Sequence, residues 1–482
     1  MMRIMPEQLK LKYIMIFSTI FIVLNTFFLA NEIYWFTLFP VVALAVITAI
    51  FALDVLMFII VFFTPLSVIL QEGDWGLAVS LPTEPLLFCV LVIYIIRLFY
   101  EGKVDKRILL HPVTVSILFY LAWITFTCIT SSMPSVSWKF LLSRLWLVIP
   151  FYFVSLHLFK EKKNKRKYIW FYIIPFSIVI IYTIINHSMD DFSEKAAHLS
   201  MVPFYSDHTS YGAIIAMYFP ILLLFTFGSE YSTKMRFISA FFLLIFSGGL
   251  FFSYTRAAWL SILLAAVVLV IYLLRIRLYT VLAIIAVMAS VFFYYQSDIL
   301  IALESGKHKN IKNKNFEQRI QSITNVTTDA SNTERFNRWS SALRMFNEKP
   351  LVGWGPGTYQ FQYAPFQISS EKTIISTNFG DVGNAHSEYL GPLAETGILG
   401  LLSVLAIIIT TLSTAGRIIY KSANKRTRAF AIVIILGLIT YFIHGTLNDF
   451  LDTDKASAPF WGFIAMLVMM DINEREINPL EN

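Results

Sequence analysis

The sequence predicts an all-α fold, a bundle of helices that crosses a membrane many times. Hydrophobic residues make up 57% of its 482 positions and charged residues only 14%. This composition excludes a soluble globular protein. Apolar runs of about 17 to 25 residues recur along the chain, and each is long enough to cross a hydrocarbon core as a helix. The expected fold is therefore a polytopic transmembrane helix bundle rather than a barrel of strands.

Counting the apolar runs of spanning length gives about fourteen helices. The second and third are separated only by Asp54, which marks either a tight turn or a buried polar position. The expected spans are 12–30, 34–52, 55–70, 85–100, 110–130, 139–158, 168–186, 209–228, 237–253, 257–274, 279–296, 389–415, 429–447 and 456–471.

Lysines and arginines in the short loops orient the bundle, because they favour the cytoplasmic side. If all the expected helices alternate, the basic clusters fall on one side together with both termini. Residues 1–296 are then expected to carry the first eleven spans, residues 297–388 to form one large external loop, and residues 389–482 to carry the last three spans and a short cytoplasmic tail. The net charge of +7 reflects this topology and does not by itself indicate a nucleic acid partner. The clusters are 3–12, 103–107, 160–167, 234–236, 275–277 and 417–428.

The external loop is far longer than the usual connection between elements, and such loops are generally functional or disordered. Residues 333–349 place apolar side chains three or four positions apart, which predicts an amphipathic helix on the outer, membrane-facing surface. Pro350 closes this helix, and Gly-Trp-Gly-Pro-Gly at 353–357 predicts a tight turn with an exposed backbone. The apolar stripe consists of Phe336, Trp339, Leu343 and Phe346.

The end of the loop carries the most informative motif. Residues 384–390 read Asn-Ala-His-Ser-Glu-Tyr-Leu, and residues 393–397 read Leu-Ala-Glu-Thr-Gly. The motif puts a titratable group, His386, where a polar loop re-enters a membrane helix. At such a boundary a membrane enzyme can meet both lipid-borne and soluble reactants.

Several motifs in order resemble the O-antigen ligase and polymerase superfamily. Arg335 lies four residues before Trp339, Lys-Pro-Leu-Val-Gly-Trp-Gly-Pro-Gly follows at 349–357, and the histidine motif completes the series. Upstream, Ser-Tyr-Thr-Arg-Ala-Ala-Trp-Leu at 253–260 resembles the family's arginine-containing helix junction. Asp207-His208 before an apolar run resembles another of its motifs.

The resemblance implies a glycosyltransferase with a bundle similar to the GT-C fold in a bacterial inner membrane. Such an enzyme moves a glycan from an undecaprenyl diphosphate carrier to a hydroxyl of a lipid, glycan or protein acceptor, among the membrane lipids. The resemblance places the reaction on the periplasmic face, with inversion at the anomeric carbon and without metal or cofactor. It identifies Arg256, Arg335 and His386 as the functional trio.

Elementary chemistry supports these roles. A diphosphate leaving group gains charge in the transition state, and guanidinium groups grip it with two hydrogen bonds. Arg256 lies at the outer end of a span, where basic residues are not favoured, so it is either functional or a snorkelling arginine that binds headgroups. Arg338 lies nearly one turn beyond Arg335, and either could be the main diphosphate ligand, although the spacing to Trp339 resembles the family at Arg335.

The neutral imidazole of His386 would take the proton from the acceptor hydroxyl as a general base. Its alternative role is a histidine that caps a helix or merely meets water.

Further candidates for the substrate site have structural alternatives. Glu388 and Glu395 either complement a helix dipole or orient His386 and an arginine. Asp207 and His208 are either a helix start or a substrate contact, and His444 either lines an acceptor cavity or packs in the bundle. Asp452 and Asp454 superficially suggest an acidic metal motif, but they lie on the outer side beside Asp449, which is read as part of a solvated turn, and no metal is expected.

A transporter or lipid flippase is the rival from another class of protein. Carriers usually show paired discontinuous helices in two related halves, and this sequence shows no such pairing. Within the enzyme class, the motifs concern the donor, so they do not separate a ligase from a repeat-unit polymerase.

Overall fold

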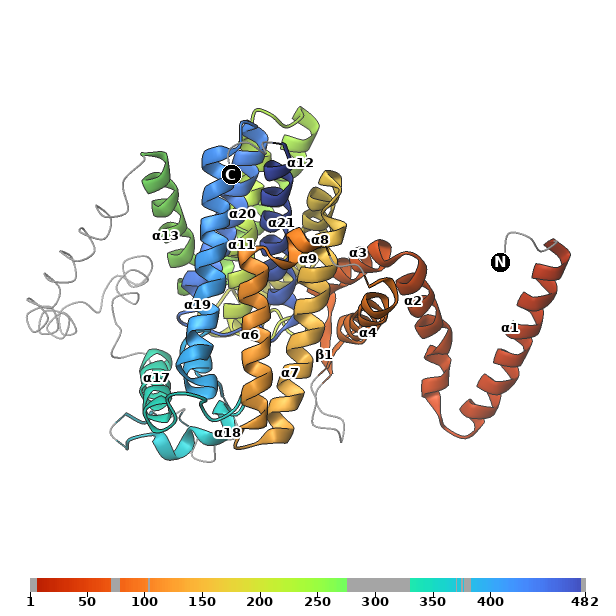
Figure 1. Cartoon of the computed structure of the whole chain (residues 1–482), viewed down its shortest axis with the longest axis horizontal. Coiled ribbons are helices and arrows are strands. Elements are labelled where there is room, and N and C mark those ends of the chain that lie inside the picture. Colours follow the sequence, from red (N-terminus) through yellow and green to blue (C-terminus); the bar gives the residue numbers. More distant parts are fainter. Residues whose placement is uncertain are drawn as a thin grey trace, which may run out of the picture. The chain divides into compact units, whose positions relative to one another are not determined.

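A computed structural model describes residues 7–70, 79–102, 105–274, 330–369, 371–373, 376 and 383–477. Within these ranges the protein is almost entirely helical, and ten helices are long and apolar enough to cross a membrane (Figure 1). The predicted all-α, polytopic class is therefore confirmed. The eleventh expected span, 279–296, lies outside the described residues.

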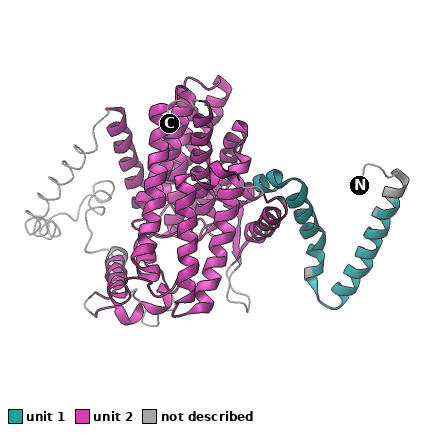
Figure 2. Ribbon diagram, in the orientation of Figure 1, with its two compact units in different colours: residues 1–59 teal, residues 60–482 magenta. Residues whose placement is uncertain are grey.

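The chain forms two compact units, residues 1–59 and residues 60–482 (Figure 2). The first unit holds α1 (Glu7–Ala30), the 3-10 turn η2 (Tyr34–Leu38) and α2 (Phe39–Phe51), and α3 (Leu53–Phe63) begins in it. The chain leaves helical geometry at Ala52, and Asp54 is exposed in the first turn of α3. Asp54 thus marks a turn rather than a buried polar position.

The expected span at 55–70 is wrong in its second half. Helix α3 ends at Phe63, and η3 (Thr64–Leu66) contains Pro65, which lacks the N–H that a continuing helix needs. The chain then forms strand β1 (Val68–Leu70), which pairs antiparallel with β2 (Val79–Leu81). Its residues Val68 and Ile69 are β-branched and favour a strand.

Most of the remaining expected spans correspond to helices of the second unit. The helix at the expected span 139–158 is continued through Pro150 by a π-helical segment. The elements are α4 (Thr83–Glu101), α5 (Lys106–Leu109), α6 (Pro112–Ile129), α7 (Pro134–Val148), η4 (Ile149–Val154), α8 (Ser155–Leu158), α9 (Lys162–Ser188), α10 (Glu194–Ala197), α11 (His208–Phe227), α12 (Thr233–Phe252), α13 (Arg256–Leu273), α17 (Ala330–Glu348), α18 (Tyr359–Gln362), η6 (Ala364–Phe366), α19 (Leu390–Lys421), α20 (Lys425–His444) and α21 (Asp454–Ile477).

Helices α11 and α21 form the centre of this unit. In the most apolar part of each helix, 78% of the residues of α11 and 94% of those of α21 are buried. The corresponding shares are 22% for α12 and 17% for α13. Helix α11 packs on α12, α13 and α20, and α19 packs on α6, α20 and α21. The peripheral α12 and α13 therefore present most of their apolar surface outward, as lipid-facing helices do.

Helix α17 confirms the helix predicted over 333–349, and it packs by the face opposite the apolar stripe, where polar residues lie beside Ala342 and Met345. Phe336 and Leu343 of the apolar stripe are 47% and 46% exposed. This orientation is the one expected of a helix whose apolar side faces lipid. The buried face consists of Glu334, Asn337, Arg338, Ser341, Ala342 and Met345.

Candidate functional site

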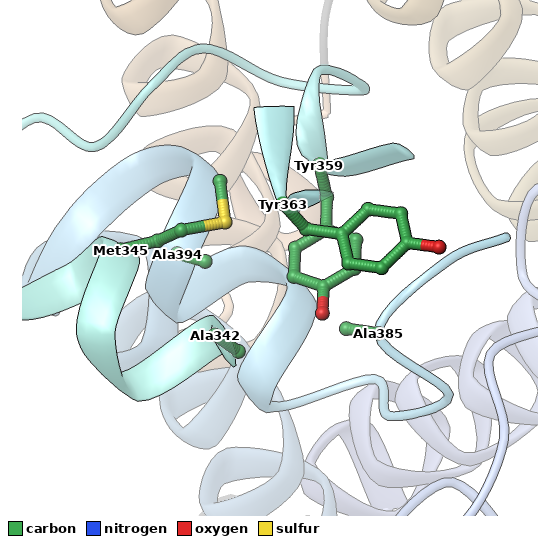
Figure 3. Close-up of a cluster of buried hydrophobic side chains, with 6 residues drawn as sticks. All are labelled: Ala342, Met345, Tyr359, Tyr363, Ala385 and Ala394. Atoms are coloured by element: carbon green, nitrogen blue, oxygen red, sulfur yellow. The ribbon is translucent and has the colours of Figure 1, made fainter. Parts of the chain in front are cut away.

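A small hydrophobic cluster joins α17, the start of α19 and the loop that carries His386 (Figure 3). Two tyrosine rings, Tyr359 and Tyr363, stack at 5.2 Å between α17 and Ala385. The Tyr359 hydroxyl donates a hydrogen bond of 2.7 Å to the backbone carbonyl oxygen of Arg338. The cluster therefore holds the histidine loop against the helix that carries the candidate arginines.

A turn forms at 353–357 as predicted, but its backbone is not exposed, because Gly353 and Gly355 are buried where the turn docks on the first turns of α19. Gly353, Gly355 and Gly357 all have positive φ, at 67°, 114° and 73°. The Glu395 carboxylate accepts hydrogen bonds of 2.9 Å from the backbone N–H groups of Gly357 and Tyr359. Glu395 thus acts first as an anchor for this turn.

His386 has a left-handed backbone conformation, with φ of 48°. Such a conformation is unfavourable for a residue with a side chain, and it is often found at functional sites. Its backbone N–H donates to the Asn384 side-chain oxygen at 3.2 Å. Burial, and then the charges of Arg338 and Arg335, lower the pKa of His386 to about 3. The imidazole is therefore neutral at ordinary pH, as a general base must be at the start of its reaction.

Arg338 is held inside the protein. Its Nε donates to Glu334 at 2.9 Å, and its Nη1 donates to the backbone carbonyl oxygen of Asn384 at 3.1 Å. The side chain is only 8% exposed. Gly383 lies so close that a Cβ atom there would overlap the guanidinium group. These contacts favour a positioning role for Arg338.

Arg256 begins α13 directly beside the start of α11. The Thr255 hydroxyl donates a hydrogen bond of 2.7 Å to the backbone carbonyl oxygen of His208. Gly212 makes this approach possible, because a Cβ atom there would lie 2.7 Å from Thr255. The Arg256 guanidinium lies 3.5 Å from the Glu194 carboxylate and is 37% exposed. No sequence motif pointed to Glu194, which approaches only through the tertiary fold.

Asp207 caps α11, since its carboxylate accepts from the N–H groups of Thr209 at 2.7 Å and Ser210 at 2.9 Å. Of the two roles predicted for Asp207, this contact is the helix cap rather than a substrate contact. His444 is 1% exposed, and its Nε2 lies 3.1 Å from the Asn448 amide nitrogen. It is thus packed in the bundle.

Arg335 links the candidate histidines electrostatically. Its charge acts on His208, His386 and His444, and the charge of Asp207 acts on the same three rings. Arg256 also acts on His208. The fold therefore brings motifs that are far apart in the sequence into one charged neighbourhood.

Glu388 anchors a second loop. Its carboxylate accepts from the Tyr441 hydroxyl at 2.6 Å and from the backbone N–H groups of Phe450 and Leu451 at 2.8 and 3.0 Å. Burial raises the pKa of Asp449 and of Asp452 in this loop. The expectation of a solvated turn at Asp449 is wrong, because its Oδ1 atom is buried.

His386 lies at the wall of a cavity of about 780 Å³. Helix α7 supplies Lys139 and Arg144 to its lining, and the loops supply Glu388, Asp449 and Asp452. Sequence reasoning missed the two basic residues, although cations inside an expected span are costly and are a usual sign of function. Neither Arg256 nor Arg335 lines this cavity.

Residues 240–405 match the O-antigen ligase family. This match covers about a third of the chain and supports its resemblance to the O-antigen ligase superfamily. The matched segment runs from α12 into α19 and includes Arg256, Arg335 and His386, whereas His208 and His444 lie outside it. The match supports, in general, a multi-pass membrane protein with ligase or polymerase activity on lipid-linked glycans. No curated protein matches the chain.

Proposed function

We propose that this protein transfers a glycan from an undecaprenyl diphosphate carrier to an acceptor hydroxyl, with inversion and without a metal. One observation carries the proposal. The half-buried His386, whose pKa is lowered by desolvation and by nearby arginines, lies between a large cavity and the charged neighbourhood of Arg335. The family match suggests the class of reaction, and this arrangement suggests a place for each reactant.

The two arginines Arg256 and Arg335 would hold the diphosphate. As the glycosidic bond breaks, negative charge grows on the leaving oxygen, and guanidinium donors stabilise that charge best in a site with little water. Glu194 beside Arg256 would keep this arginine oriented before the donor arrives. Departure of the carrier diphosphate needs no metal if both cations are in place.

His386 would take the proton from the attacking hydroxyl. The oxygen then forms the new bond to the anomeric carbon on the face opposite the leaving diphosphate, so the configuration inverts. A bound diphosphate partly cancels the charges that lower the pKa of His386, and donor binding would therefore make the imidazole a stronger base. Binding and activation of the base are coupled in this way.

The proposed location is a bacterial inner membrane, with both termini in the cytoplasm and the site in the periplasm. Arg256 and His208 begin their helices and His444 ends its helix, so alternating spans bring all three to one end of the bundle. This single-ended polar site suits an enzyme better than a transporter or flippase. The same residues would serve a ligase or a repeat-unit polymerase.

The test is transfer by purified protein in detergent. Radiolabelled carrier-linked glycan is the donor, and the acceptors are unlabelled carrier-linked glycan, a core-type lipid oligosaccharide and a hydroxyl-bearing protein. Product with the first acceptor alone identifies a polymerase, and product with either of the others identifies a ligase. The rate is expected to be unchanged in EDTA. No transfer with any acceptor, or a rate that is lost in EDTA and restored by Mg²⁺, would contradict the proposal.

A further inference from the structure

Three membrane helices begin with basic residues at the end of the bundle opposite the candidate site. Helices α9, α12 and α20 lie wholly in the described part of the chain, and none has an acidic residue in its first turn. The N-terminus of a helix already carries partial positive charge, so basic side chains there are unfavourable unless an anion lies close by. We call the exposed basic residues at these helix starts the basic patch: Lys162, Arg166, Lys234, Lys425 and Arg426.

Aromatic packing brings the starts of α9 and α20 together on α11. Trp170, one turn after Arg166, stacks on Phe225 of α11 with the ring centroids 6.0 Å apart. Phe430, one turn after Arg426, stacks on the same ring at 6.5 Å. The two patch arginines therefore lie one turn from side chains that share a single packing partner.

Tyr231 joins the start of the third helix to this group. It lies in the loop that leads into α12, and its ring contacts Phe225 at 5.1 Å. The charges of the acid Glu230 and of the two patch arginines, Arg166 and Arg426, all act on its hydroxyl. The starts of α9, α12 and α20 therefore border one basic surface.

The basic patch differs from another basic site at the same end of the bundle, which is neutralised within the protein. Among the described residues, no member of the basic patch forms an ion pair. Glu161, which precedes α9, pairs with Lys163 at 2.9 Å instead. By contrast, Arg107 pairs with Asp105 at 2.8 Å and also with Glu476. The basic patch thus keeps an excess of positive charge that Arg107 does not.

The position of the patch favours a lipid headgroup over a soluble anion. Helices α9, α11, α12 and α20 are all long and apolar enough to cross a membrane, so their ends lie at the level of the headgroups. Aromatic residues such as Trp170 and Tyr231 are typical of that level. Basic pockets between membrane helices bind the phosphate groups of anionic lipids.

We infer that the basic patch binds the phosphate headgroup of an anionic phospholipid. The lipid phosphate neutralises the starts of three helices at once, and binding therefore stabilises the bundle. The site lies at the opposite end of α20 from His444 and does not depend on the proposed glycan transfer.

The test titrates detergent-purified protein with phosphatidylglycerol, which is anionic, and with phosphatidylcholine, which has no net charge. Native mass spectrometry counts the bound lipid, and thermal unfolding measures its effect on stability. Phosphatidylglycerol is expected to bind more tightly and to raise Tm. Arg166→Gln and Arg426→Gln should each lower its affinity about fivefold, and together about 25-fold, because each basic residue near an anionic headgroup contributes about that factor.

Arg107→Gln is the matched control for each single variant. It removes one cation at the same end of the bundle, but from a side chain that already has acidic partners. Its affinity for phosphatidylglycerol should stay within about twofold of the unmodified value. If the arginine variants fold poorly, Lys162→Gln with Lys425→Gln gives a second measurement, because both lysines are exposed on the first turns of their helices, and a similar loss is expected.

Four outcomes would overturn the inference. Equal affinity for the two lipids would show ordinary contact with acyl chains, and an equal loss in Arg107→Gln would show diffuse charge without a site. A rise in Tm with inorganic phosphate as large as that with phosphatidylglycerol would show a site for free anions. A poly-glutamate peptide that binds the protein while phosphatidylglycerol does not would assign the patch to an acidic protein partner.

Discussion

Arg338 donates a hydrogen bond of 3.1 Å from its guanidinium to the backbone carbonyl oxygen of Asn384, two residues before His386. With its second bond to Glu334, this contact ties α17 to the histidine loop. A lysine cannot make both bonds, because it lacks the planar fork of donors. We therefore expect Arg338→Lys to lower kcat by about tenfold or more through a misplaced base.

The KM for donor separates this role from direct binding of the diphosphate. It should stay unchanged in Arg338→Lys, and Glu334→Gln should reproduce the loss of kcat. A large rise in the donor KM with kcat preserved would show that Arg338 is a diphosphate ligand instead.

Arg256→Lys and Arg335→Lys are each expected to lower kcat/KM by about 10²-fold, although the charge is kept. The reason is that an ammonium group cannot grip a diphosphate with two parallel hydrogen bonds. Arg344→Lys is the control on the same helix as Arg335, since Arg344 instead pairs with Glu371 at 2.6 Å. Full activity of both lysine variants would mean that these arginines act only as diffuse positive charge.

The acid limb of the pH profile should lie well below the ordinary pKa of histidine. Because the pKa of His386 is lowered from 6.5 to about 3, the free enzyme keeps a neutral base as the pH falls through 6.5. The profile of kcat/KM reports the free enzyme and kcat reports the complex with substrate. The kcat limb is therefore expected at higher pH than the kcat/KM limb, since bound diphosphate favours the imidazolium. A kcat/KM limb near 6.5 that disappears in His386→Ala would contradict the lowered pKa of this base.

Gly353→Ala should destabilise the protein by about 1 to 3 kcal/mol. Its φ of 67° is unfavourable for alanine, and a Cβ atom would overlap the backbone at Glu395. Gly416→Ala in α19 is the matched control, because nothing lies within 4 Å of a Cβ atom there. Thermal unfolding in detergent measures both, and equal melting temperatures would show that the turn does not depend on this glycine.

Much of the fold could be predicted because hydrophobic length and periodicity are local properties. The helix at α17, the glycine turn after it and most of the spans follow from such patterns. The strand pair was not predicted, because residues 68–70 are as apolar as the end of a membrane helix. Only Pro65 indicates that the helix stops before them. Which face of α17 is buried could not be predicted, because burying Arg338 requires its hydrogen bonds to Glu334 and to the backbone of Asn384, which only the tertiary fold brings together.

The candidate site was predictable in part for a similar reason. Arg335 and His386 lie in motifs, and their electrostatic interaction agrees with a shared site, although their roles remain predictions. The cavity residues Glu84 and Trp461 are separated by most of the chain and belong to no motif. Only tertiary packing brings such residues together, so a single sequence gives no sign that they line the same cavity.

The central claim is that His386 is the base of a glycan transfer reaction, and the initial rate of His386→Ala tests it most directly. The purified variant is given carrier-linked glycan and the acceptor that the unmodified protein uses, after both proteins are shown to melt at the same temperature. Loss of a general base should lower the rate by about 10²- to 10⁴-fold. Transfer by His386→Ala at the unmodified rate would contradict the claim.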